Sequence, residues 1–207
     1  FKNLGVTVAG LKLSEFTGTA AFDEARIEVP NLKGQVEGGA LSMDLAVKDY
    51  TTSRPFVELT ASLSQFDLGK FFAAKASLAS AEPKTQASDR ETGSKGKLTV
   101  GRLTHPNAEV QGLEAQWEVS GIAPDLKKLS GRAKMSSTGG RFNSIGKMAA
   151  QSALVKVMVF PLMIFQKLGG IGGLRIFPDF NDISFTELVG DYVFAAGMMT
   201  PYHEVNS

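Results

Sequence analysis

Apolar and polar residues alternate along three stretches of the chain, which cover residues 41–47, 57–63 and 113–119. Because successive side chains of a β-strand point to opposite faces, this alternation predicts strands with one apolar and one polar face. Such one-sided strands are typical of antiparallel sheets, whereas buried parallel strands have continuous apolar runs. The apolar positions supply the candidate site residues, namely Leu41, Met43, Leu45, Val47, Val57, Leu59, Leu63, Leu113, Trp117 and Val119.

Shorter alternating pieces lie near residues 4–8, 11–13, 27–29 and 98–100, and a last strand is expected over residues 185–194. Gly, Pro and Asn residues separate several of these pieces and predict turns at Pro30-Asn31, Gly38-Gly39 and Pro106-Asn107. The fold class predicted from the pattern is therefore mainly β, with antiparallel strands.

Two short helices are expected after strands, over residues 67–72 and 125–129, because each begins with an aspartate that can cap a helix. Residues 80–97 are small and polar without a period, which predicts a flexible loop. The chain thus divides into a β segment over 1–79, the loop over 80–97, a second β segment over 98–142, and a final part over 143–207.

The final part contains a strongly apolar stretch over residues 144–168, which predicts one helix that begins at Ser144 and ends before Gly169-Gly170. A membrane span is disfavoured because Lys156 near a bilayer centre would cost about 2.5–3.5 kcal/mol. The helix can instead pack on the sheet, plug the end of a groove or lie on a membrane surface. Its candidate contact residues are Val155, Val159, Phe160, Leu162 and Phe165.

Composition excludes several kinds of function. Lys and Arg total 22 against 21 Asp and Glu, and this balance argues against nucleic-acid binding. Without Cys there is no disulfide, thiolate nucleophile or Cys-bound zinc, and the two His residues, His105 and His203, form neither a triad nor a ligand set. We therefore expect no catalytic residue, no metal, no cofactor and no enzyme activity.

Several segments resemble the AsmA-like proteins of Gram-negative envelopes. They combine strands rich in Gly, short helices that begin with Asp-Leu directly after a strand, and an apolar helix before a last strand. The resemblance covers most of the chain and is carried by residues 32–41, 63–72, 120–131 and the stretch from Phe142 to Tyr192. Because the first residue is Phe1, we interpret the chain as the C-terminal portion of a longer protein.

The resemblance implies a repeating β-groove, which is a long, bent antiparallel sheet with short helices and an apolar concave face. Members of the family are related to bridge-like lipid transfer proteins, which implies binding and passage of phospholipid acyl chains and a part in outer-membrane lipid homeostasis. It also implies a periplasmic location with the parent protein anchored in the inner membrane. The implied partners are phospholipid, a membrane reached through the parent chain or the apolar helix, and other envelope proteins.

Two alternatives remain open at this point. The same alternation suits a closed β-sandwich, and hence a structural scaffold for outer-membrane assembly that carries no lipid. A compact carrier of a single lipid is also compatible with it, although such a barrel has no need of the long apolar helix. The exposure of the face that carries Leu41 and Leu45 decides between an open groove and a sealed core.

Overall fold

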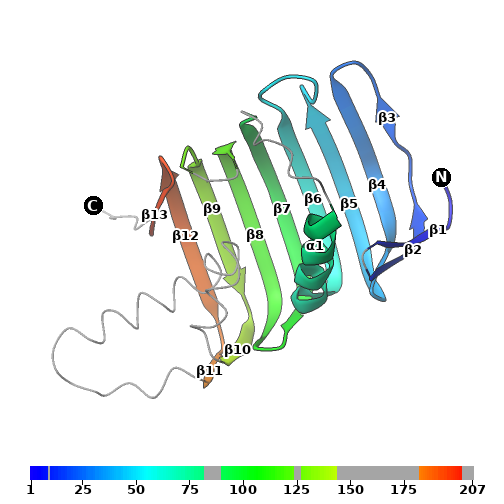
Figure 1. The fold of residues 1–207 in the computed structure, drawn as a ribbon. Helices are drawn as coiled ribbons and strands as arrows, with labels where there is room; N and C mark the ends of the chain where they lie inside the picture. Colours follow the sequence, from blue (N-terminus) through cyan, green and yellow to red (C-terminus); the bar gives the residue numbers. More distant parts are fainter. Residues whose placement is uncertain (9, 82–89, 124–126, 144–181, 202–207) are drawn as a thin grey trace.

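A computed structural model describes residues 1–8, 10–81, 90–123, 127–143 and 182–201. In this part of the chain, all strands belong to one open sheet, and one helix accompanies them (Figure 1). The mainly β prediction is confirmed. The elements are β1 Leu4–Val8, β2 Leu11–Thr17, β3 Ala21–Phe22, β4 Arg26–Val36, β5 Gly39–Lys48, β6 Phe56–Asp67, α1 Leu68–Ala81, β7 Thr92–His105, β8 Ala108–Ile122, β9 Ser130–Ser137, β10 Gly139–Asn143, β11 Asp182–Phe185, β12 Leu188–Ala195 and β13 Met198–Pro201.

The strands follow one another across the sheet almost in chain order, β1-β2-β4-β5-β6-β7-β8-β9-β12-β13. β3 extends the side of β4, and β10 lies between β8 and β11. The predicted turns at Gly38-Gly39 and Pro106-Asn107 are confirmed, since they join β4 to β5 and β7 to β8. Pro30-Asn31 is not a turn, because both residues lie inside β4, where Asn31 adopts a φ of 52° and the register with β5 shifts as in a bulge.

The prediction of a wholly antiparallel sheet is wrong at one place, because β6 and β7 pair in parallel. A parallel neighbour needs a crossover connection, and α1 begins that connection directly after β6. Asp67 caps the helix as expected, since its Oδ1 accepts a hydrogen bond of 3.0 Å from the backbone N–H of Lys70. The helix spans 14 residues, however, and is thus longer than the stretch predicted from residues 67–72.

Two further predictions need correction, and a third lies outside the described residues. The loop predicted over residues 80–97 is too long, since α1 continues to Ala81 and β7 begins at Thr92, while 82–89 lie outside the described residues. Lys127 and Lys128 of the second predicted helix form a turn. The apolar helix over 144–168 lies outside the described residues, and none of the helical structure within them has the length and apolar character to cross a membrane.

The sheet bends sharply along a line that crosses β6 to β12. Val100 and Leu103 are both buried although they lie three positions apart, and Val110 and Leu113 repeat this spacing on β8. All four belong to one hydrophobic cluster. Residues three apart on a regular strand point to opposite faces, so the set of positions that points inward changes from odd to even, or the reverse, where a strand crosses this line. We call this line the corner. It passes Gly101, Gly112 and Thr138, and the Thr186-Glu187 break between β11 and β12 lies on it, which is why the strand predicted over 185–194 is two strands.

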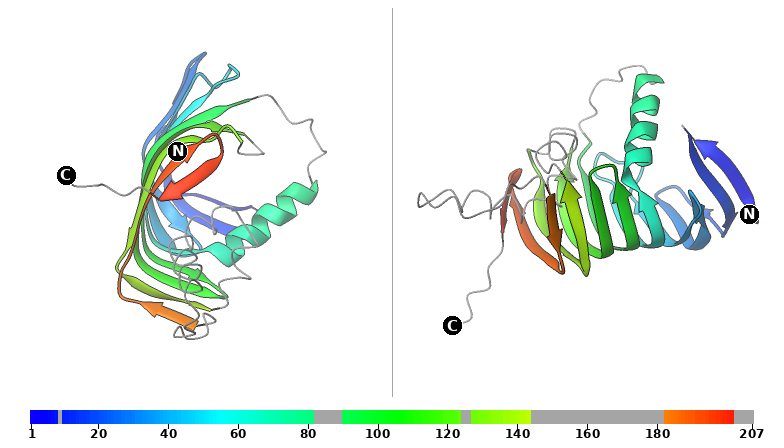
Figure 2. Two further views of the ribbon diagram at one scale, coloured as in Figure 1. Left: turned by 90° about the vertical axis from the view of Figure 1, so that its left-hand side faces the viewer. Right: turned by 90° about the horizontal axis from the view of Figure 1, so that it is seen from below.

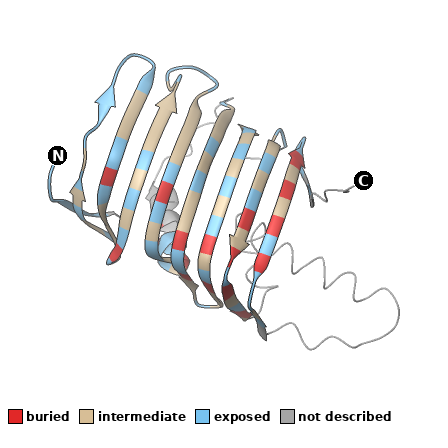
Figure 3. Cartoon of the chain, turned by 180° about the vertical axis from the view of Figure 1, so that it is seen from behind, coloured by how far each residue is buried: buried red, intermediate tan, exposed pale blue. Residues whose placement is uncertain are grey.

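The corner gives the sheet a concave side, which carries α1 (Figure 2). Leu68 of α1 lies in the same hydrophobic cluster as Val100, Leu113 and Tyr192, so the face that holds these residues is the concave one. Buried positions are concentrated on β7 to β12, as Figure 3 shows from behind. The strands near the N-terminus contribute few of them, among which are Leu32 and Ala61.

Candidate functional site

All ten candidate residues predicted from the alternation share the concave face. The register pairs Leu41 with Leu63, Leu45 with Leu59 and Val47 with Val57. It continues from Leu59 through Gly96 to Trp117, and from Leu63 through Val100 to Leu113. We call this surface the apolar face. It also contains residues that the sequence reasoning did not select, namely Ile27, Val29, Leu32, Leu98, Val100, Met135, Tyr192 and Phe194.

The apolar face is only partly covered. Nine of the ten candidates are half-buried, and Leu113 alone among them is buried, with 5% of its surface exposed. Every strand of the described residues belongs to the same sheet, so no second sheet packs on this face within them. The sealed sandwich is therefore not the architecture of this part of the chain.

Aromatic rings lie along the apolar face above glycines. A Cβ on Gly96 would lie 2.6 Å from the ring of Trp117, and a Cβ on Gly34 would lie 2.8 Å from the ring of Phe16. The indole is also held by its Nε1–H, which donates a hydrogen bond of 2.8 Å to Ser94 Oγ on β7. Because glycine has no side chain, these rings can lie close to the backbone and leave the face with low relief.

The first turn of α1 packs at the corner end of the apolar face. Leu68 and Ala74 are buried, and Phe72 contacts the hydrophobic cluster of the sheet. Phe71 remains 39% exposed and contacts the rings of Phe66 and Phe72 at centroid distances of 5.6 and 5.9 Å. The helix therefore covers the corner end of the face and leaves the rows around Leu45 and Leu59 half-exposed.

The opposite, convex face is polar, and its charges are matched in pairs. Salt bridges join Lys48 to Glu58 at 2.7 Å and Lys134 to Asp191 at 3.1 Å. The hydrogen bond from Lys48 holds the pKa of the Glu58 carboxyl below its ordinary value. A shallow depression of about 670 Å³ lies on this face, between side chains that include Lys97 and Gln116. Its open, charged lining offers no apolar enclosure for a ligand.

Groups for catalysis or metal binding do not gather in the described part of the chain. No three His, Asp or Glu side chains come together there as a metal site would require. His105 is the last residue of β7, and its Nδ1 accepts a hydrogen bond of 3.1 Å from the backbone N–H of Asn107 in the turn that follows. His203 and the candidate contacts Val155, Val159, Phe160, Leu162 and Phe165 lie outside the described residues.

The chemistry available to the apolar face is thus non-directional burial of apolar groups. Comparison with known proteins adds nothing to this geometry, because no family model, no curated protein and no solved structure matches the chain. The AsmA-like family therefore remains a resemblance carried by the residues given above.

Proposed function

We propose that the apolar face is an open groove that binds phospholipid acyl chains and lets them pass along the sheet. The observation that carries this proposal is the half-burial of Leu41, Leu45 and Leu59 on a curved sheet without a covering layer in the described residues. Apolar surface left in water costs about 25 cal/mol per Å². An acyl chain removes that cost without requiring a fixed position, because its contacts are non-directional.

The shape of the face supports passage as well as binding. Rows of apolar side chains run across successive strands from β4 to β8, as the register from Val29 through Leu45, Leu59 and Gly96 to Trp117 illustrates. The aromatic rings over Gly34 and Gly96 lie close to the backbone, which keeps the face low at these two positions. Matched charges on the convex face keep the other side of the sheet compatible with water.

In this proposal the groove serves phospholipid transport in the Gram-negative envelope and so supports outer-membrane lipid homeostasis. The periplasm is the proposed location, and the inner membrane holds the proposed anchor of the parent chain. These assignments follow from the resemblance to AsmA-like proteins and from the fit of an apolar groove to that task. The protein is proposed to act without catalysis.

The test compares two charged variants that lie on opposite faces of β6. Leu59→Asp places a carboxylate on the apolar face, whereas Ser62→Asp places one on the exposed convex face. The purified chain is incubated with vesicles of phosphatidylethanolamine and phosphatidylglycerol, separated from them and analysed by native mass spectrometry.

We expect bound phospholipid on the unchanged chain and on Ser62→Asp, and little on Leu59→Asp. Circular dichroism must show that Leu59→Asp is folded, because an unpaired charge in a sealed core would unfold the protein. Absence of lipid from the unchanged chain, or equal lipid on both folded variants, would overturn the proposal.

A scaffold for outer-membrane assembly is the second candidate, and the edge of β1, which pairs with β2 alone among the described strands, favours it. Leu4 and Val6 on this edge strand are 53% and 47% exposed, and an unpaired strand edge can bind another protein chain by strand addition. A chain that carries no lipid but crosslinks to envelope proteins through β1 would support the scaffold instead.

A further inference from the structure

A serine interrupts the apolar face where that face is only half covered. Ser94 of β7 pairs with Val57 of β6 on one side and with Val119 of β8 on the other, so its neighbours in the row are valines. It lies on the same side of the sheet as Trp117, whose indole it contacts. The alternation of β7 therefore places a hydroxyl group at a position where an apolar side chain is expected.

This hydroxyl group differs in exposure from the others on the same face. The four rows that cross β6 at alternate residues within 57–63 carry three side-chain hydroxyl groups in the described strands from β4 to β9 and β12, those of Ser94, Ser137 and Tyr192. Ser137 and Tyr192 are 3% and 1% exposed, whereas Ser94 is half-buried. Of the three, Ser94 is therefore the one that a molecule on the open part of the face can reach.

Trp117 orients the hydroxyl group of Ser94. The indole Nε1–H donates a hydrogen bond of 2.8 Å to Ser94 Oγ. A serine hydroxyl has one proton to donate and two lone pairs that accept, and the indole uses one of the lone pairs. The hydroxyl makes no other hydrogen bond within the described residues, so its proton is available to an acceptor on the face. Accepting a bond from the indole also makes the hydroxyl a stronger donor.

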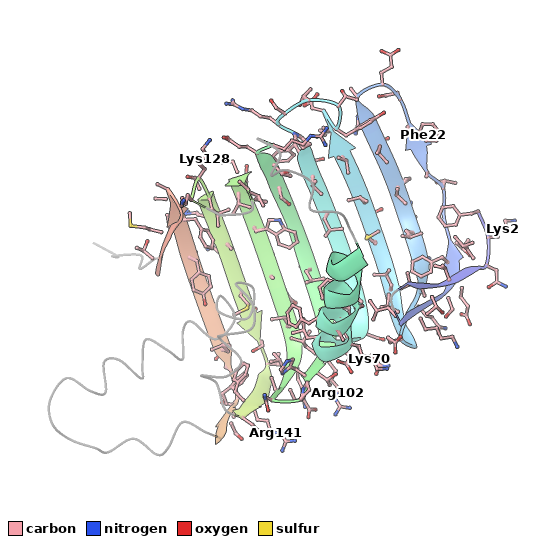
Figure 4. The ribbon with its side chains drawn as sticks, viewed as in Figure 1. Lys2, Phe22, Lys70, Arg102, Lys128 and Arg141 are labelled. Carbon is pink, nitrogen blue, oxygen red and sulfur yellow. The ribbon has the colours of Figure 1, made fainter. Side chains whose placement is uncertain are left out.

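Ser94 lies in the row nearest to the strand ends opposite the corner. It is the third residue of β7, and Val57 beside it is the second residue of β6. Lys128 lies at that border of the sheet, whereas Lys70 and Arg102 lie at the corner end (Figure 4). In a phospholipid the ester carbonyls lie between the headgroup and the acyl chains. A lipid whose chains lie on the inner rows therefore brings its esters to the row of Ser94 and its headgroup to the border.

We propose that Ser94 donates its hydroxyl proton to an ester carbonyl of the bound lipid and so positions the polar end of the acyl chain at the outermost row. This inference rests on the proposed lipid-binding function and deepens it, since it names acyl esters as the preferred lipid class. An ether-linked chain offers the same apolar length without the carbonyl. One neutral hydrogen bond changes affinity by roughly twofold to tenfold, so it biases the position of a lipid without preventing its passage.

The experiment offers the full chain equimolar diacyl and dialkyl phosphatidylcholine of equal chain length in mixed vesicles, then quantifies the extracted lipids by mass spectrometry. Ser94→Ala removes the hydroxyl group, and Ser94→Thr keeps it. Ser62→Ala is the matched control, because it removes a hydroxyl group from the exposed convex face of the neighbouring strand. Circular dichroism shows which variants are folded.

The unchanged chain, Ser94→Thr and Ser62→Ala should recover the diacyl lipid over the dialkyl lipid by roughly threefold or more, and Ser94→Ala should recover both equally. Equal recovery by the unchanged chain, or the same preference in folded Ser94→Ala as in the control, would overturn the role of Ser94 while leaving lipid binding intact. Recovery of neither lipid by the unchanged chain would overturn the proposed function itself.

A second pair of variants separates lipid binding from support of the indole, because Ser94→Ala also deprives the Trp117 N–H of its acceptor. Trp117→Phe removes that N–H and keeps the serine, so it should retain a preference for the diacyl lipid. Ser94→Ala in the same background should abolish the preference. Equal recovery of both lipids by folded Trp117→Phe would show that Ser94 serves the indole alone, and would overturn the proposal.

A last arm uses the unchanged chain and so does not depend on the folding of a variant. Trp117 is the single tryptophan of the chain, and it contacts Ser94. Bromine atoms near the ester end of an acyl chain should therefore quench its fluorescence more than bromine atoms near the methyl end. Equal quenching by the two bound lipids would show that the polar end has no fixed position, and would overturn the role of Ser94 without touching the proposed function.

Discussion

The strands β4–β6 and the strands β7–β12 contribute to the same apolar face but differ in how far that face is covered. On β5, Leu41 and Leu45 remain half-exposed, whereas Val100 on β7 and Tyr192 on β12 are each 1% exposed. The difference arises at the corner, where the bent strands bring cluster residues from β7, β8, β10 and β12 together. The comparison teaches that alternation defines a face but does not define what covers it.

The largest expected difference between the two regions is in the free energy of unfolding that is lost when one large side chain in each is truncated. Phe142 is 1% exposed and stacks on Phe185 at 5.2 Å, so Phe142→Ala should lower the free energy of unfolding by about 3–5 kcal/mol. Leu45→Ala should cost about 1 kcal/mol, because half-exposed Leu45 has less apolar burial to lose. Urea denaturation measures both, and similar losses would show that the two regions are equally packed.

Two glycine substitutions sharpen the comparison by probing the backbone beneath the aromatic rings. A Cβ on Gly96 would lie 2.3 Å from the carbonyl oxygen of Leu59 as well as near Trp117, whereas the nearest atoms to a Cβ on Gly34 belong to the ring of Phe16 alone. Gly96→Ala should therefore cost about 1–3 kcal/mol, and Gly34→Ala less, because the ring can move. Thermal melting of the two variants tests this order, and a more damaging Gly34→Ala would contradict it.

The smallest effect concerns polar support on the N-terminal side. Glu37 accepts a hydrogen bond of 2.6 Å from the backbone N–H of Lys12 and pairs with Lys70, and these contacts hold the pKa of its carboxyl below the ordinary value. A depressed folded-state pKa contributes stability above the unfolded-state value, and this contribution is lost as the pH falls through the folded-state value. Glu37→Gln removes the charge but keeps an oxygen that can accept the hydrogen bond.

The melting temperature of Glu37→Gln should therefore lie slightly below that of the unchanged chain at about pH 6, and the difference should shrink as the pH is lowered toward about 3. Because the carboxylate is close to the surface, added salt should also reduce the difference. A gap that persists at both pH values would mean that the substitution acts through packing rather than through the charge.

The sequence allowed the strands β5, β6 and β8 to be predicted, because their alternation is long and uninterrupted. The alternation places the candidates of each strand on one face, and the pairing between strands shows that these faces lie on the same side of the sheet. The corner was not predicted, although the sequence contains a signal for it in the segments Val100-Gly101-Arg102-Leu103 and Val110-Gln111-Gly112-Leu113. Apolar residues three apart break a strict strand period, and the glycines between them allow the bend.

Other features could not be predicted, for identifiable reasons. The parallel pairing of β6 with β7 depends on the path of a crossover, which one-sided strands do not specify. β9 was not selected because its segment, from Ser130 to Ser137, offers only small and charged residues around Met135.

The parallel seam between β6 and β7 also has a consequence for the order of folding. The antiparallel neighbours β4, β5 and β6 are close in sequence, as are β7, β8 and β9, so each group can form from local contacts. The seam must wait for closure of the connection through α1, and non-local pairing of this kind is slow. We expect the two antiparallel units to form early and to dock late. Until they dock, the edge of β6 is open. Because α1 directly follows β6 in the chain, it is the first element able to shield that edge.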